Sequence, residues 1–207
     1  MIFFKRFIDN IGDSRKSNSD SDAIFTLSSA YISLETRLNL ISTGRCGICI
    51  KKVDPDVNFN DLKQSIENLL DASKKTDLKL SYGVNIDEYH DLLWLVIDVK
   101  TIEDSVACIT VISEILEQKG LVIQLKCAVF EFGKKGSEHQ PYYLNYDYEL
   151  DKFYPFVPIM GKQKTRNSRE EMNMMRAFSK DKLPFEEDAS KWDPIWHLPS
   201  RIGAVPL

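Results

Sequence analysis

The chain has 207 residues, of which 43% are hydrophobic and 28% are charged. These proportions are typical of a globular protein with a real core and exclude wholesale disorder or a fibrous repeat. Twenty-seven basic and 31 acidic residues give a net charge of −4, which argues against a general binder of the nucleic-acid backbone. The longest apolar run, residues 92–97, is far shorter than the ~20 residues of a membrane-spanning helix. We therefore expect a soluble or peripheral protein.

The first twelve residues predict a short amphipathic arm. Their apolar side chains recur at helical spacing and are accompanied by two basic residues; the set is Phe3, Phe4, Lys5, Arg6, Phe7, Ile8 and Ile11. Residues 13–22 contain no apolar side chain and predict a polar linker. We expect the arm to contact a protein partner or a membrane surface, or to fold back onto the body or a second subunit.

Residues 23–150 predict an α+β domain, an antiparallel sheet packed with helices. Apolar residues at spacings of three and four begin a helix at Ala23, and a strand follows at 44–53. A helix starting at Phe59, two strands at 78–84 and 92–100, and a helix over 102–120 come next. Strands at 121–132 and 141–150 close the series around a polar loop at 133–140.

Residues 151–207 differ in composition, because six of the eight prolines and two of the three tryptophans lie there. We predict a Pro/Trp-rich C-terminal extension that wraps and packs on the domain. One helix is expected from Ser168 to Lys180, with Ser168 and Glu171 as a capping box and with Met172, Met175 and Ala177 or Phe178 as its apolar stripe. The rest is expected to be extended.

Two groups of residues are candidates for metal or redox chemistry. Cys46 and Cys49 have the spacing of a dithiol, but a strand would point them to opposite faces. Asp87, Glu88, His90 and Asp91 crowd a predicted hairpin tip, where solvated loop charge is the simpler interpretation. We predict no metal, no cofactor and no catalytic residue. Four cysteines without a signal peptide indicate a reducing cytoplasm.

A basic stretch lies in the extension. It contains Lys162, Lys164, Arg166 and Arg169 and no acidic residue before Glu170. Either it forms a patch that contacts nucleic acid, anionic lipid or an acidic partner, or it is a solvated loop that pairs with the acidic residues at 184–188. No aromatic residue interleaves with these bases, so nucleic acid is not expected.

Three sequence blocks of the extension resemble the PspAB family of PspA-associated proteins. The first is Phe153-Tyr154-Pro155-Phe156-Val157-Pro158, which the basic stretch follows. The second begins with Leu183-Pro184 and continues to Asp188, and the third is Lys191-Trp192-Asp193-Pro194-Ile195-Trp196. The Phe-rich start, the polar linker and the first helix are similar as well.

The resemblance implies a non-catalytic cytoplasmic accessory protein of a PspA-type membrane-stress response, with a PspA-like protein or an HtpX-like protease as partner. It implies no enzymatic activity, and it makes the motif residues structural. The order of elements is similar to YbjN and type III secretion chaperone domains, which bind proteins. The alternative is an enzyme with dispersed polar residues near the 85–91 hairpin or the 162–169 loop. A homo-oligomer is left open.

Deletion of residues 1–12 tests the arm. We expect the thermal transition to stay nearly unchanged and co-sedimentation with anionic liposomes or with a PspA-type partner to fall. Lys5 and Arg6 add only ~1 kcal/mol each at an anionic surface, so the arm alone binds weakly. Equal sedimentation of both proteins in both assays would remove the arm from the mechanism.

Overall fold

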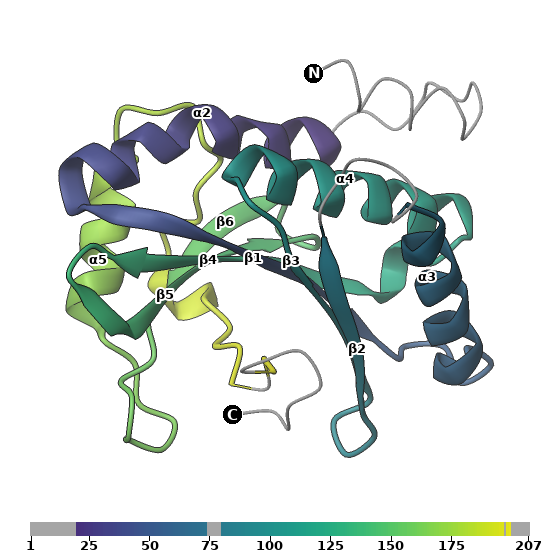
Figure 1. Ribbon diagram of the computed structural model, residues 1–207. Helices are drawn as coiled ribbons and strands as arrows, with labels where there is room; N and C mark the ends of the chain where they lie inside the picture. Colours follow the sequence, from purple (N-terminus) through teal and green to yellow (C-terminus); the bar gives the residue numbers. More distant parts are fainter. Residues whose placement is uncertain (1–19, 74–79, 197, 200–207) are drawn as a thin grey trace.

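A computed structural model describes residues 20–73, 80–196 and 198–199, so the predicted arm and most of the linker lie outside the described residues (Figure 1). The centre of the fold is an antiparallel sheet of six strands in the order β2-β3-β1-β4-β5-β6. The strands are β1 (Leu40–Lys51), β2 (Ser81–Asp87), β3 (Leu92–Asp98), β4 (Leu125–Lys134), β5 (Ser137–Asp147) and β6 (Lys152–Phe156). The predicted α+β class is confirmed.

The helices lie on one face of the sheet. They are α2 (Asp20–Leu38), α3 (Phe59–Ser73), α4 (Ile102–Gln118) and α5 (Ser168–Ala177), with short 3₁₀ turns η1 (Val122–Gln124) and η2 (Ala189–Lys191). Figure 1 shows α2 and α4 side by side over the sheet, with α5 and α3 toward its two ends. Alternate strand residues such as Ile48, Leu95 and Phe130 form the main core with these helices. In the described part of the chain no helix has the length and apolar character needed to cross a membrane.

The predicted order of helix, strand, helix, hairpin, helix and hairpin is confirmed. Local signals explain the helix starts. The Asn58 side chain accepts a hydrogen bond from the backbone N–H of Asn60 at 2.9 Å, and Thr101 caps α4 by accepting from the N–H of Asp104.

Several predicted strand ends were wrong. β1 starts at Leu40, because Asn39 takes a positive φ of 55° and turns the chain from α2 directly into the sheet. Residues 85–87 were predicted as loop but continue β2, and most of the expected 133–140 loop belongs to β4 and β5. Ladder hydrogen bonds keep these polar residues extended, and hydropathy does not report such bonds.

The boundary predicted at Leu150 divides a continuous sheet. Residues Lys152–Phe156, expected only to be extended, form β6 and pair with β5. The last part of the tail covers the face opposite the helices, where Ile195 and Leu198 join Trp94, Val129 and other residues in a second buried cluster. The extension is therefore a structural part of the domain.

The helix of the extension is shorter than predicted and buries a different stripe. Asn167 is its N-cap, accepting from the N–H of Glu170, so the capping box with Ser168 was wrong. Glu171, Met174 and Ala177 are the buried residues of α5, while Met172 and Met175 are half-buried. The prediction missed this stripe because it counted only apolar side chains. The buried side of α5 includes Glu171, whose carboxylate is paired with Arg166.

Replacing Trp192 with Ala tests whether the tail stabilises the domain. Trp192 is 5% exposed, and its Nε1 donates to the Glu186 carbonyl oxygen at 2.8 Å. Loss of a buried tryptophan should lower the free energy of unfolding by ~3–5 kcal/mol, measured by urea denaturation. Trp196→Ala, at a half-buried site, should lose less. Equal losses in the two variants, or none, would contradict this account.

Candidate protein-binding site

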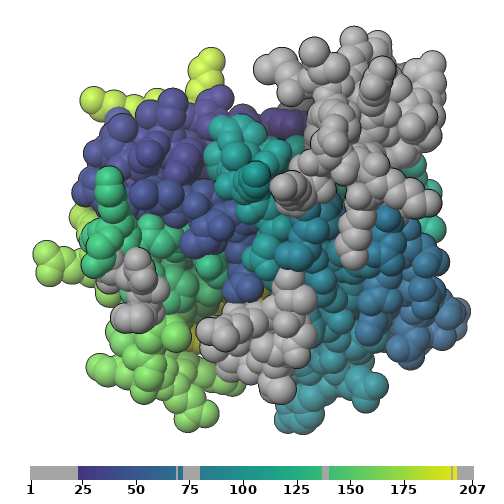
Figure 2. Space-filling view, viewed as in Figure 1, coloured from purple at the N-terminus to yellow at the C-terminus, as the bar shows by residue number. Residues whose placement is uncertain are grey.

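Residues 157–167 form a protruding loop, called here the basic hairpin. Its two arms are joined at the base, where the N–H of Asn167 donates to Val157 O at 2.7 Å and Ile159 donates to Thr165 O at 2.8 Å. Gly161 and Lys164 turn the tip with φ values of 77° and 44°. In Figure 2 the yellow-green hairpin projects from the lower edge of the molecule. These bonds give the hairpin a defined shape.

An ion pair between half-buried Arg166 and buried Glu171 holds the base of the hairpin. Arg166 Nε lies 2.9 Å from both carboxylate oxygens of Glu171, whose residue is only 1% exposed. The same carboxylate accepts from the N–H of Val157 at 2.9 Å. The guanidinium lies near the Phe156 and Trp192 rings, with its carbon 5.9 and 5.8 Å from their centroids, and Nη1 donates to Trp192 O. Four segments thus meet at one charge pair.

The Leu183-Pro184 block closes the outer edge of β6. The N–H of Phe153 donates to Pro184 O at 2.7 Å, and the N–H of Glu186 donates to Phe153 O at 2.8 Å. Lys152 Nζ lies 3.2 Å from the Glu186 carboxylate. The N–H of Asp188 and the charge of Lys152 lower the pKa of Glu186. The edge strand is therefore covered by the chain itself.

The third block is attached through Asp193. Its backbone oxygen accepts from the Tyr154 hydroxyl at 2.9 Å, and its carboxylate pairs with Lys126 Nζ at 2.6 Å. Trp196 packs edge-on against Phe156, with ring centroids 4.8 Å apart. The three motif blocks thus lie together around β6. The residues predicted to be structural in them are Phe153, Tyr154, Pro155, Phe156, Pro158, Leu183, Pro184, Trp192, Pro194 and Trp196.

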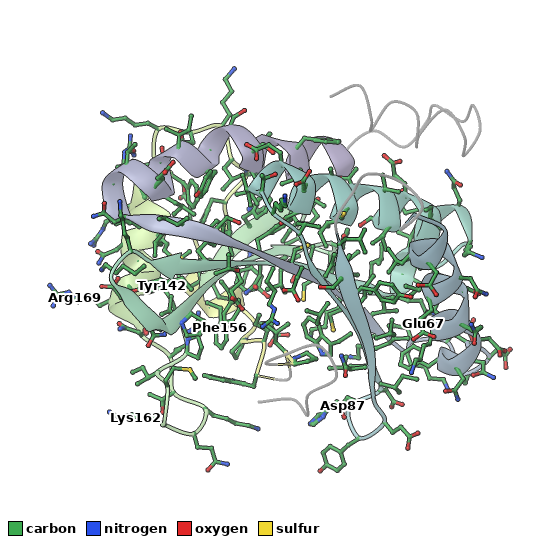
Figure 3. The ribbon with its side chains drawn as sticks, in the orientation of Figure 1. Glu67, Asp87, Tyr142, Phe156, Lys162 and Arg169 are labelled. Carbon is green, nitrogen blue, oxygen red and sulfur yellow. The ribbon has the colours of Figure 1, made fainter. Side chains whose placement is uncertain are left out.

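Three of the four predicted basic residues remain at the surface. Lys162, Lys164 and Arg169 are exposed, and Figure 3 shows Lys162 and Arg169 directed away from the body. Arg166, the fourth, is half-buried and paired with Glu171. Within the described chain, none of the three exposed bases forms an ion pair with the 184–188 acids.

The charge of this region is opposite to that of the whole chain. Residues 159–182 contain seven basic and three acidic residues, a net charge of +4 in a chain of net charge −4. Two of the three acids are engaged, Glu171 with Arg166 and Glu170 with Lys134 at 3.7 Å. The hairpin and α5 therefore present a positive surface.

The 85–91 hairpin brings two of the predicted residues, Asp87 and His90, together. His90 Nδ1 lies 2.8 Å from Asp87 Oδ2, and Tyr89 is 90% exposed. A cavity of about 420 Å³ lies beside this tip, between the end of β2 and the start of α3. Glu88 and Asp91 line it, but His90 does not. The histidine of this hairpin is therefore held by Asp87 and does not contribute to the lining of the cavity.

The cysteines separate as the strand prediction required. Cys46 faces the helical core, and its Sγ lies 3.9 Å from Ser105 O, whereas Cys49 lies on the opposite face. Cys49 stands directly opposite Cys127 across the β1–β4 ladder. Burial raises the pKa of the Cys49 thiol well above its usual value, and the neighbouring Cys127 thiol raises it further. In residues 20–73, 80–196 and 198–199, His, Cys, Asp and Glu form no group of three with metal-site geometry.

Sequence reasoning missed the acids that anchor the hairpin and the tail. Glu171 was assigned to a helix cap, Glu186 was grouped with the 184–188 acids as a partner of the basic stretch, and Asp193 was given no role. Asp193 stands beside a tryptophan in the third block, which was a usable signal for a structural carboxylate. The partner of Glu171 depended on how β6 and α5 pack, which spacing does not report.

The geometry defines an α+β protein whose C-terminal motif blocks fasten a protruding basic hairpin to the edge of a sheet. The chain belongs to the PspAB family: the family model of PspA associated protein B matches residues 1–200. The comparisons found no curated protein and no solved structure that matches the chain.

Replacing Arg166 with Met tests the ion pair. The change leaves Glu171 buried without its counter-charge, which should lower the free energy of unfolding by ~3–5 kcal/mol. The double variant Arg166→Met/Glu171→Gln should lose clearly less than the sum of the two single variants, as measured in a double-mutant cycle by chemical denaturation. Lys162→Ala is the control and should stay within ~0.5 kcal/mol of the parent. An additive cycle would show that the pair does not act as a unit.

Proposed function

We propose that this protein is a non-catalytic accessory protein of a PspA-type membrane-stress response, which binds an acidic surface of a PspA-like protein through its basic hairpin. It acts in the cytoplasm, at the inner face of the membrane. The N-terminal arm adds a weak peripheral contact there, and an HtpX-like protease is a second partner of the same assembly.

The observation that carries this proposal is the local charge. Lys162, Lys164 and Arg169 project from the molecule in a segment of net charge +4, and the remainder of the chain is acidic. An acidic partner is attracted to this segment and repelled by the rest, which orients the encounter. Family membership supports PspA-like proteins as the class of partner.

The contacts that hold the base of the hairpin support the same proposal. A binding surface held in one shape loses less conformational freedom on association than a free loop does. The Arg166–Glu171 pair and the Trp192 contact hold this loop by its base and leave its tip exposed. The motif residues then matter for binding because they position the hairpin.

Charge reversal tests the proposal with the purified PspA-like protein encoded in the same genome. The triple variant Lys162→Glu/Lys164→Glu/Arg169→Glu should weaken binding at least about tenfold in biolayer interferometry, and the affinity of the parent should fall as salt is raised. The matched control Lys51→Glu/Lys100→Glu/Lys119→Glu changes the net charge equally at three exposed lysines elsewhere.

Binding by the control at parental affinity, with loss in the first variant, supports the hairpin as the site. Equal loss in both variants would assign the effect to net charge. Failure of the parent protein to bind would refute a PspA-like partner.

A further inference from the structure

Strand β2 ends the sheet on the side away from β6 and α5 (Figure 1). It pairs with β3 over seven consecutive residues without a bulge. Edge strands are normally protected by lysine, proline, a bulge or a covering segment. The opposite edge has such a cover, because the backbone of Pro184–Glu186 bonds to β6. Residues 81–86 of β2 contain no proline and no charged side chain.

The hydrogen bonds of β3 fix which residues of β2 face outward. At the two ends of the β1–β3 ladder, the N–H of Lys52 donates to Asp91 O and the N–H of Val99 donates to Gly44 O, both at 2.9 Å. Bonded residues alternate along an antiparallel strand. The odd-numbered residues of β3 therefore bond to β1, and its even-numbered residues bond to β2.

The backbone groups of Val84 and Ile86 consequently point away from the sheet. Gly83 and Asn85 stand opposite even-numbered residues of β3 and bond to them. Within the part of the chain that the structure describes, no hydrogen bond from another segment reaches the N–H or C=O of Val84 or Ile86. The edge thus offers two donors and two acceptors to an added strand.

Asn85, between these two residues, indicates which strand fits. Its Nδ2 forms no hydrogen bond with any described residue. A primary amide carries both donors and an acceptor, so the amides of two copies can bond to each other. Two copies of this uncharged strand also pair without placing like charges opposite each other. The edge is therefore complementary to itself.

We propose that two copies of this chain join their β2 strands antiparallel, with the two-fold axis at Asn85. Val84 of one copy then stands opposite Ile86 of the other, and each such pair exchanges two backbone hydrogen bonds. The side chains of Val84 and Ile86, which are half-buried against the helical core, cover each other across the axis. On the opposite face, the Asn85 amides turn toward the axis and bond to each other. Because both copies use the same surface, the assembly closes as a dimer.

Sedimentation velocity and hydrogen exchange test this proposal over an about hundredfold range of protein concentration. The protein should sediment as a monomer at the low end and as a dimer at the high end. The amides of Val84 and Ile86 should exchange at least about tenfold more slowly in the dimer. Those of Gly83 and Asn85 are already bonded to β3 and should be protected at both ends of the range.

The variant Asn85→Asp tests the position of the axis. It places two carboxylates opposite each other and should weaken dimerisation at least about tenfold at neutral pH. The matched control Ser179→Asp adds the same charge at an exposed site after α5, at the other end of the sheet, and should dimerise like the parent. Thermal unfolding verifies that both variants are folded. If Asn85→Asp does not fold, the exchange of Val84 and Ile86 in the parent decides the question.

Three results would overturn the proposal. One is a parent protein that stays monomeric over the whole range. Another is exchange of Val84 and Ile86 that does not depend on concentration, which would leave the edge open or assign its cover to the same chain. The third is a dimer that persists unchanged in Asn85→Asp. None of these measurements uses the basic hairpin or a PspA-like protein, so their outcome is independent of the proposed function.

Discussion

A carboxylate removed from water must be neutralised where it lies, and the C-terminal third of this protein is arranged around that requirement at Glu171. The residue is 1% exposed and sits in a helix that packs on the sheet. Arg166 and the N–H of Val157 satisfy its oxygens. Because Arg166 also contacts Trp192, the position of the tail depends on the same pair. Removing either partner leaves the other charge without compensation, whereas removing both is milder.

The tail protects the sheet as well as the ion pair. An open edge strand presents unpaired backbone groups to other chains. At β6 the backbone of Pro184–Glu186 pairs with Phe153. On the face opposite the helices, Ile195 and Leu198 cover Trp94 and Cys49. These contacts explain why three motif blocks that are separated along the chain belong to one structural unit, from which the basic hairpin projects.

Much of the fold was predictable, and three of the failures share one cause. Period and capping signals identified α2, α3 and α4 and the antiparallel hairpins in the correct order. The errors fell at residues 85–87, in the 133–140 loop and at β6, where polar residues or prolines are held extended by pairing to a neighbouring strand. A ladder bond depends on the partner strand and leaves little trace in the hydropathy of either one. For the candidate site, the basic stretch was found, but the role of Arg166 was not.

The sequence by itself determined the α+β class, the order of the elements and the local excess of positive charge, because periodicity, caps and charge are properties of neighbouring residues. It also determined that Cys46 and Cys49 would separate, since a strand alternates its faces. Only the tertiary structure decided that Arg166 is half-buried in an ion pair while Lys162, Lys164 and Arg169 are exposed. The four bases are alike in the sequence. What distinguishes them is whether a buried carboxylate lies within reach, and the packing of α5 against β6 sets that distance.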